Sequence, residues 1–123
     1  MGEEELEFAR AAVKFKVPVC FVCSRCDVYL YSRQQSGDID EMTQDEADRL
    51  IKELRPKFDQ EIARVPEIDS SDVPLFFISA PSLRRLIQFI AKPENGLPNN
   101  YIRYEESRFI EYLQKKSAES RSI

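Results

Sequence analysis

The stretch VPVCFVC, residues 17–23, decides the fold of this chain. It carries no charge and is rich in β-branched and aromatic side chains, so it is short for a helix and suits a strand buried on both faces. VPLFFIS, residues 73–79, repeats the order of valine, proline and apolar core, and a proline is tolerated at the start of a strand. Two such strands separated by helical sequence predict a parallel pair with a helical crossover.

Helical periodicity surrounds the two strands. An apolar stripe over residues 3–16 predicts an amphipathic helix, and a similar stripe follows the second strand. Prolines and a glycine in residues 92–100 end the helix that follows the second strand. Residues 101–116 predict a last helix with a thinner apolar stripe. We therefore divide the chain into an α/β unit, residues 3–91, and a linker with a C-terminal helix and frayed tail, residues 92–123.

The segment between the strands predicts a loop and then a helix. Residues 31–42 are polar and contain a glycine, which favours a loop. Thr43 and Glu46 have the spacing of a capping box, and apolar residues at helical spacing follow them. Pro56 lacks a backbone N–H and crowds the preceding turn, so we expect it to kink or end this helix near Leu54.

The composition indicates one modest domain and argues against several classes of partner. The chain has 123 residues, of which 42% are hydrophobic and 33% charged. Its net charge of -4 argues against a nucleic acid partner, because phosphate binding needs a concentrated positive face. No stretch approaches the roughly 18 apolar residues of a transmembrane segment, and the acidic start differs from a signal peptide. We expect a cytoplasmic protein, and its termini suggest an excised piece or a natural truncation.

Three cysteines lie within seven positions, at Cys20, Cys23 and Cys26. This spacing is typical of zinc and iron–sulfur ligands, yet a structural zinc takes four ligands, and the chain has no histidine and no fourth cysteine. Alternation along a strand also points Cys20 and Cys23 to opposite faces. We therefore expect no metal. We expect Cys20 and Cys23 to be buried and slow to react with a thiol reagent, and Cys26, beyond the strand, to be more exposed and faster.

Candidate binding residues follow the strands, because ligands of open parallel sheets lie outside the carboxyl ends of the strands. Ser-Arg-x-Asp, residues 24–27, follows the first strand and resembles the guanine-specificity motif of GTPases. The resemblance implies that the Asp27 carboxylate accepts hydrogen bonds from the ring N–H and the exocyclic amine of guanine, a pair of donors that adenine lacks on that edge. Arg25 has a planar head that can cover a face of the base, and the Ala80 N–H can donate to the guanine carbonyl. The simpler interpretation is that Asp27 caps a turn at an ordinary strand exit.

The two strand exits resemble the guanine-specificity motifs of GTPases. Ser-Arg-x-Asp at residues 24–27 resembles the Asn/Thr-Lys-x-Asp motif, and Ser79-Ala80 resembles the Ser-Ala-Lys motif after the next strand. With the preceding helix and the long insertion between the exits, residues 3–91 are similar to the immunity-related (interferon-inducible) GTPases. The resemblance implies a partial three-layer P-loop-GTPase-like α/β sandwich with strands at about 17–23 and 73–79. It also implies guanine binding by Ser24, Arg25, Asp27, Ser79 and Ala80.

The chain departs from that family at several positions. Arg25 stands where the family has lysine, and Pro81 follows Ala80 where lysine is usual. The sequence has no Gly-x-x-x-x-Gly-Lys-Ser/Thr phosphate loop and no Asp-x-x-Gly motif. Phosphate contacts and magnesium carry most of the nucleotide binding and the chemistry. We therefore expect binding of GTP or GDP and magnesium in a parent GTP hydrolase, where the missing N-terminal half would hold the magnesium. For this chain alone we expect no hydrolysis, no cofactor and weak or undetectable nucleotide binding.

Two interpretations of function stay open. In the first, the chain is the base-recognition portion of a larger immunity-related or dynamin-like GTPase. In the second, it is a non-catalytic α/β protein-interaction module derived from a degenerate GTPase. In the first interpretation the first strand has an unpaired edge, where the missing N-terminal half of a complete G domain would supply a neighbour. We expect this edge to make the isolated chain self-associate.

Overall fold

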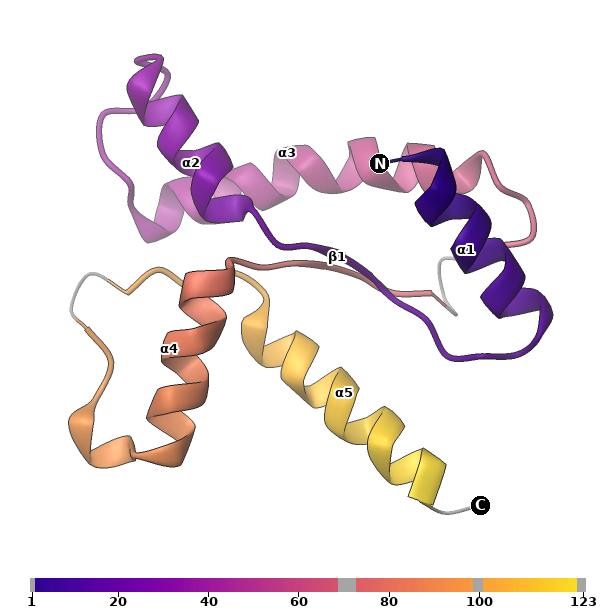
Figure 1. The fold of residues 1–123 in the computed structure, drawn as a ribbon. Helices are drawn as coiled ribbons and strands as arrows, with labels where there is room; N and C mark the ends of the chain where they lie inside the picture. The colour runs from indigo at the N-terminus through magenta and orange to yellow at the C-terminus, as the bar shows by residue number, and fades with distance from the viewer. Residues whose placement is uncertain (1, 69–72, 99–100, 122–123) are drawn as a thin grey trace.

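The computed structural model describes residues 2–68, 73–98 and 101–121, and it has the small α/β fold that the sequence predicts. Two short parallel strands lie between two layers of helices, α1, α2 and α3 on one side and α4 and α5 on the other (Figure 1). The elements run α1 (Glu3–Lys14), β1 (Phe21–Cys23), α2 (Cys26–Gln35), α3 (Gln44–Ala63), β2 (Leu75–Phe77), α4 (Ala80–Ala91), a 3₁₀ turn η1 (Pro93–Asn95) and α5 (Glu106–Arg121). No helix in the described ranges is long and apolar enough to cross a membrane.

The predicted strand pair is confirmed as parallel, with Val22 opposite Phe76 at its centre. Each strand has three residues, however, and is shorter than the expected 17–23 and 73–79. Successive side chains of β2 face opposite layers because side chains alternate along a strand. Phe77 packs edge to face on Phe58 of α3, with ring centroids 5.5 Å apart. Phe76 packs against Phe109 of α5 at the same centroid distance. The second strand is therefore buried on both faces, which explains its unbroken apolar sequence.

The helix α3 confirms one prediction and corrects another. The Thr43 hydroxyl accepts a hydrogen bond from the Glu46 N–H at 3.2 Å, as expected of the capping box. Pro56, however, does not end the helix, which continues to Ala63. Burial of Leu50 before the proline and of Ile62 after it stabilises both halves, and this offsets the roughly 3 kcal/mol that an internal proline costs.

Two segments differ from the sequence prediction. The expected loop at residues 31–42 begins inside a helix, because α2 runs from Cys26 to Gln35 and buries only Cys26 and Leu30. Two buried positions make too narrow an apolar stripe for the periodicity to stand out. The expected helix at residues 101–116 begins only at Glu106 and runs to Arg121. The last two residues of the expected frayed tail lie outside the described residues.

Glu105, just before α5, and Glu106, its first residue, close the outer edge of β2. The Glu105 N–H donates to the Phe77 carbonyl at 2.8 Å, and the Phe77 N–H donates to the Glu105 carboxylate at 3.0 Å. Farther along the edge, the Ser79 N–H donates to the Glu106 carboxylate at 3.1 Å. Among the described residues β1 has β2 as its one neighbouring strand, so no strand pairs with its outer edge there.

Candidate functional site at the strand exits

The structure brings the two strand exits together. Arg25 and Ser79 form an isolated antiparallel bridge just beyond the parallel pair. The Ala80 N–H donates to the Ser24 carbonyl at 3.3 Å. Four of the five residues that the GTPase resemblance singles out therefore lie in one hydrogen-bonded junction, and Asp27 follows two residues later in the first turn of α2.

Ser79 and Ala80 begin the helix α4. Ser79 is buried, and its hydroxyl accepts a hydrogen bond from the Ser82 N–H at 3.3 Å, which makes it the N-cap. The Ala80 side chain is exposed, but its N–H is bonded to the Ser24 carbonyl. A guanine carbonyl would therefore have to replace Ser24 as the acceptor for that N–H.

Asp27 lines a small hollow of about 160 Å³ between α2, α4 and the segment before α5. Ser79, Ser82, Tyr101 and Tyr104 also line it. Burial raises the pKa of both tyrosines, so their hydroxyls stay neutral at physiological pH. The hollow thus combines one half-buried carboxylate with neutral hydrogen-bonding groups and the charged side chain of Arg85.

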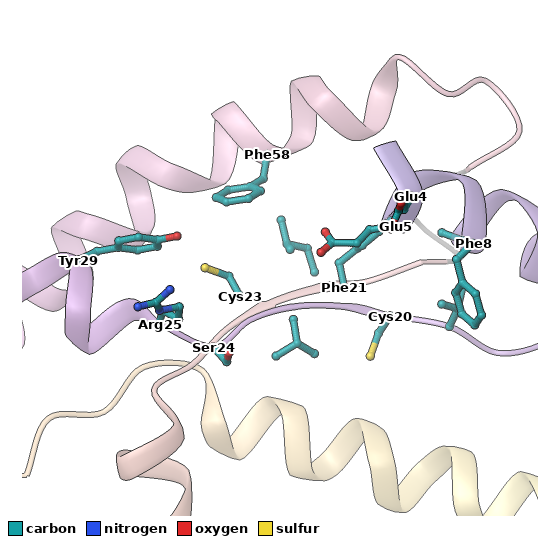
Figure 2. A pocket seen from close by; sticks show the side chains of 14 residues that line it. Glu4, Glu5, Phe8, Cys20, Phe21, Cys23, Ser24, Arg25, Tyr29 and Phe58 are labelled. Atoms are coloured by element: carbon teal, nitrogen blue, oxygen red, sulfur yellow. The ribbon is translucent and has the colours of Figure 1, made fainter. Parts of the chain in front are cut away.

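Ser24 and Arg25 line a different and larger hollow, a groove of about 580 Å³. Every residue from Val19 to Arg25 contributes to the groove, so it follows the outer edge of β1. Figure 2 shows the Arg25 side chain beside Tyr29, on the side of β1 that faces α3. The Ser-Arg-x-Asp motif is therefore divided, with Arg25 in the groove and Asp27 in the small hollow.

Glu106 is a site residue that the sequence prediction missed. It is only 1% exposed, and its two carboxylate oxygens accept hydrogen bonds from the Tyr104 N–H at 2.9 Å and the Ser79 N–H at 3.1 Å. Burial raises the pKa of this carboxyl, although these hydrogen bonds act in the opposite direction. Its sequence signal is a glutamate in an otherwise apolar helical stripe that includes Ile102, Phe109 and Leu113.

The cysteines are arranged differently from the prediction. Cys20 and Cys23 do lie on opposite sides of the strand, as expected (Figure 2), but both are only half-buried. Cys26, expected to be exposed, is completely buried, because it begins α2 on the face that packs into the core. Among the residues that the structure describes, no three acidic, cysteine or histidine side chains converge as metal ligands.

Comparison of the chain with protein-family models, with curated proteins and with solved structures gives no match.

Proposed function

We propose that this chain is the base-recognition portion of a larger guanine-nucleotide-binding protein of the immunity-related or dynamin-like type. The observation that carries the proposal is the junction of the two strand exits, where Arg25 pairs with Ser79 and Ser24 accepts from Ala80. A base-reading site in an open parallel sheet needs two neighbouring carboxyl ends of strands. Beyond this junction, the Asp27 carboxylate supplies the acceptor that distinguishes guanine from adenine.

The size of the hollow at Asp27 supports recognition of a base by itself. Sites that enclose a drug-sized ligand usually measure about 300–1,000 Å³. The hollow of about 160 Å³ suits a single base and leaves the sugar and phosphates outside. In the proposed parent protein, the phosphate loop and magnesium site would come from the other part of the G domain and would supply most of the affinity and the hydrolytic chemistry.

This proposal is tested by titrating isotope-labelled protein with guanosine and adenosine monophosphates and recording backbone amide shifts. We expect weak, saturable shifts with the guanine nucleotide, in the millimolar range, at Asp27 and at the amides of Ser79 and Ala80. The adenine nucleotide should leave these amides unchanged, and magnesium should have no effect. Equal shifts with both nucleotides, or micromolar magnesium-dependent binding of GDP, would contradict the proposal.

The second candidate is a protein-interaction module, and the open edge of β1 favours it. Val22, at the centre of this strand, is 39% exposed, and Phe8 beside the groove is 70% exposed. An uncovered strand edge presents unpaired N–H and C=O groups to another strand. In an antiparallel pair of two copies, Arg25 at one end of the groove would face Glu4 and Glu5 at the other end of the second copy's groove.

Light scattering over a concentration series tests this second candidate. We expect the mean mass to rise with concentration, and the charge reversals Arg25→Glu and Glu4→Lys/Glu5→Lys to suppress the rise when each variant is alone. Mixing the two variants should restore association, because both charge contacts are then attractive again. A monomer at every concentration, or variants that do not restore each other, would exclude this mode of pairing.

A further inference from the structure

The junction between β1 and α2 is a Cys-x-x-Cys sequence, Cys23-Ser24-Arg25-Cys26, whose sulfur chemistry has no part in the functions proposed above. Ile78, the residue that follows β2, forms hydrogen bonds with the backbones of both cysteines. The Ile78 N–H donates to the Cys23 carbonyl at 2.8 Å, and the Cys26 N–H donates to the Ile78 carbonyl at 3.2 Å. The Cys26 sulfur lies 3.8 Å from the Cys23 carbonyl oxygen. The two cysteines are therefore kept together by the strand pairing.

The two sulfurs differ in how they can be reached. Cys23 is half-buried and lines the groove beside β1, whereas Cys26 is 0% exposed. The groove, at about 580 Å³, is within the usual range for small-molecule sites. A small molecule in the groove can meet Cys23, whereas Cys26 is buried and does not line the groove.

The environment of Cys23 favours a thiolate. A hydrogen bond from the Cys26 thiol, opposed by partial burial and assisted by the Arg25 backbone N–H and the Tyr29 hydroxyl, lowers the pKa of Cys23 to about 6. The carboxylates of Glu4 and Glu5 also line the groove. The lowered pKa raises the share of Cys23 that is ionised at neutral pH, and the thiolate is the nucleophilic form of cysteine.

The environment of Cys26 keeps its proton in place. Its hydrogen bond to the Cys23 sulfur, its burial and the nearby negative charges of Cys23, Glu106 and Asp27 all raise its pKa. The charge of Cys23 disappears once that sulfur forms a covalent bond, and ionisation of Cys26 then becomes easier. One cysteine is thus arranged to attack first and the other to attack second.

We propose that Cys23 and Cys26 form a redox-active dithiol that reduces small-molecule disulfides, with Cys23 as the attacking thiolate and Cys26 as the resolving thiol. The Cys23 thiolate attacks one sulfur of the substrate RS–SR′, forms a Cys23–S–S–R bond and releases R′S⁻. Cys26 then loses its proton and attacks the Cys23 sulfur, which breaks the mixed disulfide and releases RS⁻. The protein dithiol loses two electrons and becomes a disulfide. The substrate gains these two electrons and, after uptake of two protons, is released as RSH and R′SH.

Cys20 supplies an internal control in the same strand. It is half-buried like Cys23, but burial raises its pKa, and Figure 2 shows it on the opposite side of β1, facing α5. Cys20 should therefore take no part in the exchange. Any general effect of cysteine exposure would act on Cys20 and Cys23 alike.

The first test uses the unmodified protein with limiting iodoacetamide at pH 6, followed by peptide mass spectrometry. A cysteine with a pKa near 6 is about half ionised at that pH, and its lower intrinsic nucleophilicity offsets only part of this gain. We expect Cys23 to be alkylated about tenfold or more faster than Cys20, and Cys26 to be the slowest. Equal rates for Cys20 and Cys23, or fastest reaction at Cys26, would overturn the proposal.

The second test uses glutathione disulfide as the substrate. The unmodified protein and Cys20→Ser should both end with a Cys23–Cys26 disulfide, and dithiothreitol should reverse it. Cys26→Ser, checked for its fold by circular dichroism, should stop at a stable glutathione adduct on Cys23, and Cys23→Ser should form neither product. Glutathione on Cys20, a disulfide that includes Cys20, or no oxidation of the unmodified protein would refute the assigned roles.

Discussion

The substitution Glu105→Ala tests how the outer edge of β2 is closed. Glu105 accepts a hydrogen bond from the Phe77 N–H at 3.0 Å and pairs with both Arg55 and Arg108. Phe77 is completely buried, so alanine would leave its N–H without an acceptor and without access to water. Arg55 would keep its hydrogen bond to the Leu75 carbonyl and its position over the Phe77 ring.

The expected loss follows from these contacts. A buried N–H left without a partner costs about 1–3 kcal/mol. Loss of the Arg55 pair adds roughly 0–1 kcal/mol, since that side chain is 32% exposed. The 68% exposed Arg108 should add nothing measurable. We therefore expect Glu105→Ala to lower the free energy of unfolding by about 1–4 kcal/mol, which lowers Tm by on the order of 10 °C in a domain of this size.

Urea denaturation and thermal melts of three variants provide the assay. Glu105→Gln retains an oxygen that can accept from Phe77 and removes only the charge, so it should cost less than about 1 kcal/mol. Glu111→Ala, at an exposed position of α5, the helix that follows Glu105, controls for loss of a carboxylate and should leave stability nearly unchanged. If the alanine and glutamine variants at position 105 lose equally little, the Phe77 N–H does not depend on Glu105 and this account of the β2 edge is wrong.

Two further predictions concern single contacts. Thr43→Ala should lower the free energy of unfolding by about 1 kcal/mol in urea titrations, because it removes the acceptor for the Glu46 N–H. Thr43→Ser keeps a hydroxyl and should retain most of this stability. An alanine variant as stable as the unmodified protein would mean that the cap contributes nothing. Burial raises the pKa of Glu106 in the folded protein above its value in the unfolded chain, which is about 4.3. As pH rises from about 4.3 through the folded pKa, the unmodified protein should therefore lose stability relative to Glu106→Gln. Unfolding titrations between pH 4 and 7 measure this difference, and a change in the opposite direction would contradict the assigned pKa shift.

The sequence predicts the parts of this fold that depend on local patterns. The two apolar runs predict a parallel pair, and Thr43 with Glu46 predicts the start of α3, because each signal lies within a few residues. The helix α2 was missed since only Cys26 and Leu30 are buried along its ten residues. Continuation of α3 through Pro56 could not be predicted locally, because it depends on packing such as that of Phe58 on Phe77.

The candidate site was predictable only in part. The residues that follow the strands could be named because ligands of parallel sheets lie at those ends. The capping of Phe77 and Ser79 by Glu105 and Glu106 could not be foreseen, since it joins residues 27 or 28 positions apart. The burial of Cys26 likewise involves a distant segment, because its N–H donates to the carbonyl of Ile78, the residue that follows β2. Contacts between distant segments, rather than local propensity, explain what the sequence prediction missed.

Exchange of base specificity at Asp27 tests the proposed function most directly. Xanthine has a carbonyl where guanine has its exocyclic amine, so an asparagine at position 27 can donate to xanthine while its oxygen still accepts from the ring N–H. We expect Asp27→Asn to lose the amide shifts caused by guanosine monophosphate and to gain them with xanthosine monophosphate. The control Asp59→Asn, at an exposed position of α3, should keep the preference for guanine. If Asp27→Asn responds to both nucleotides as the unmodified protein does, Asp27 does not read the base and the proposed function is contradicted.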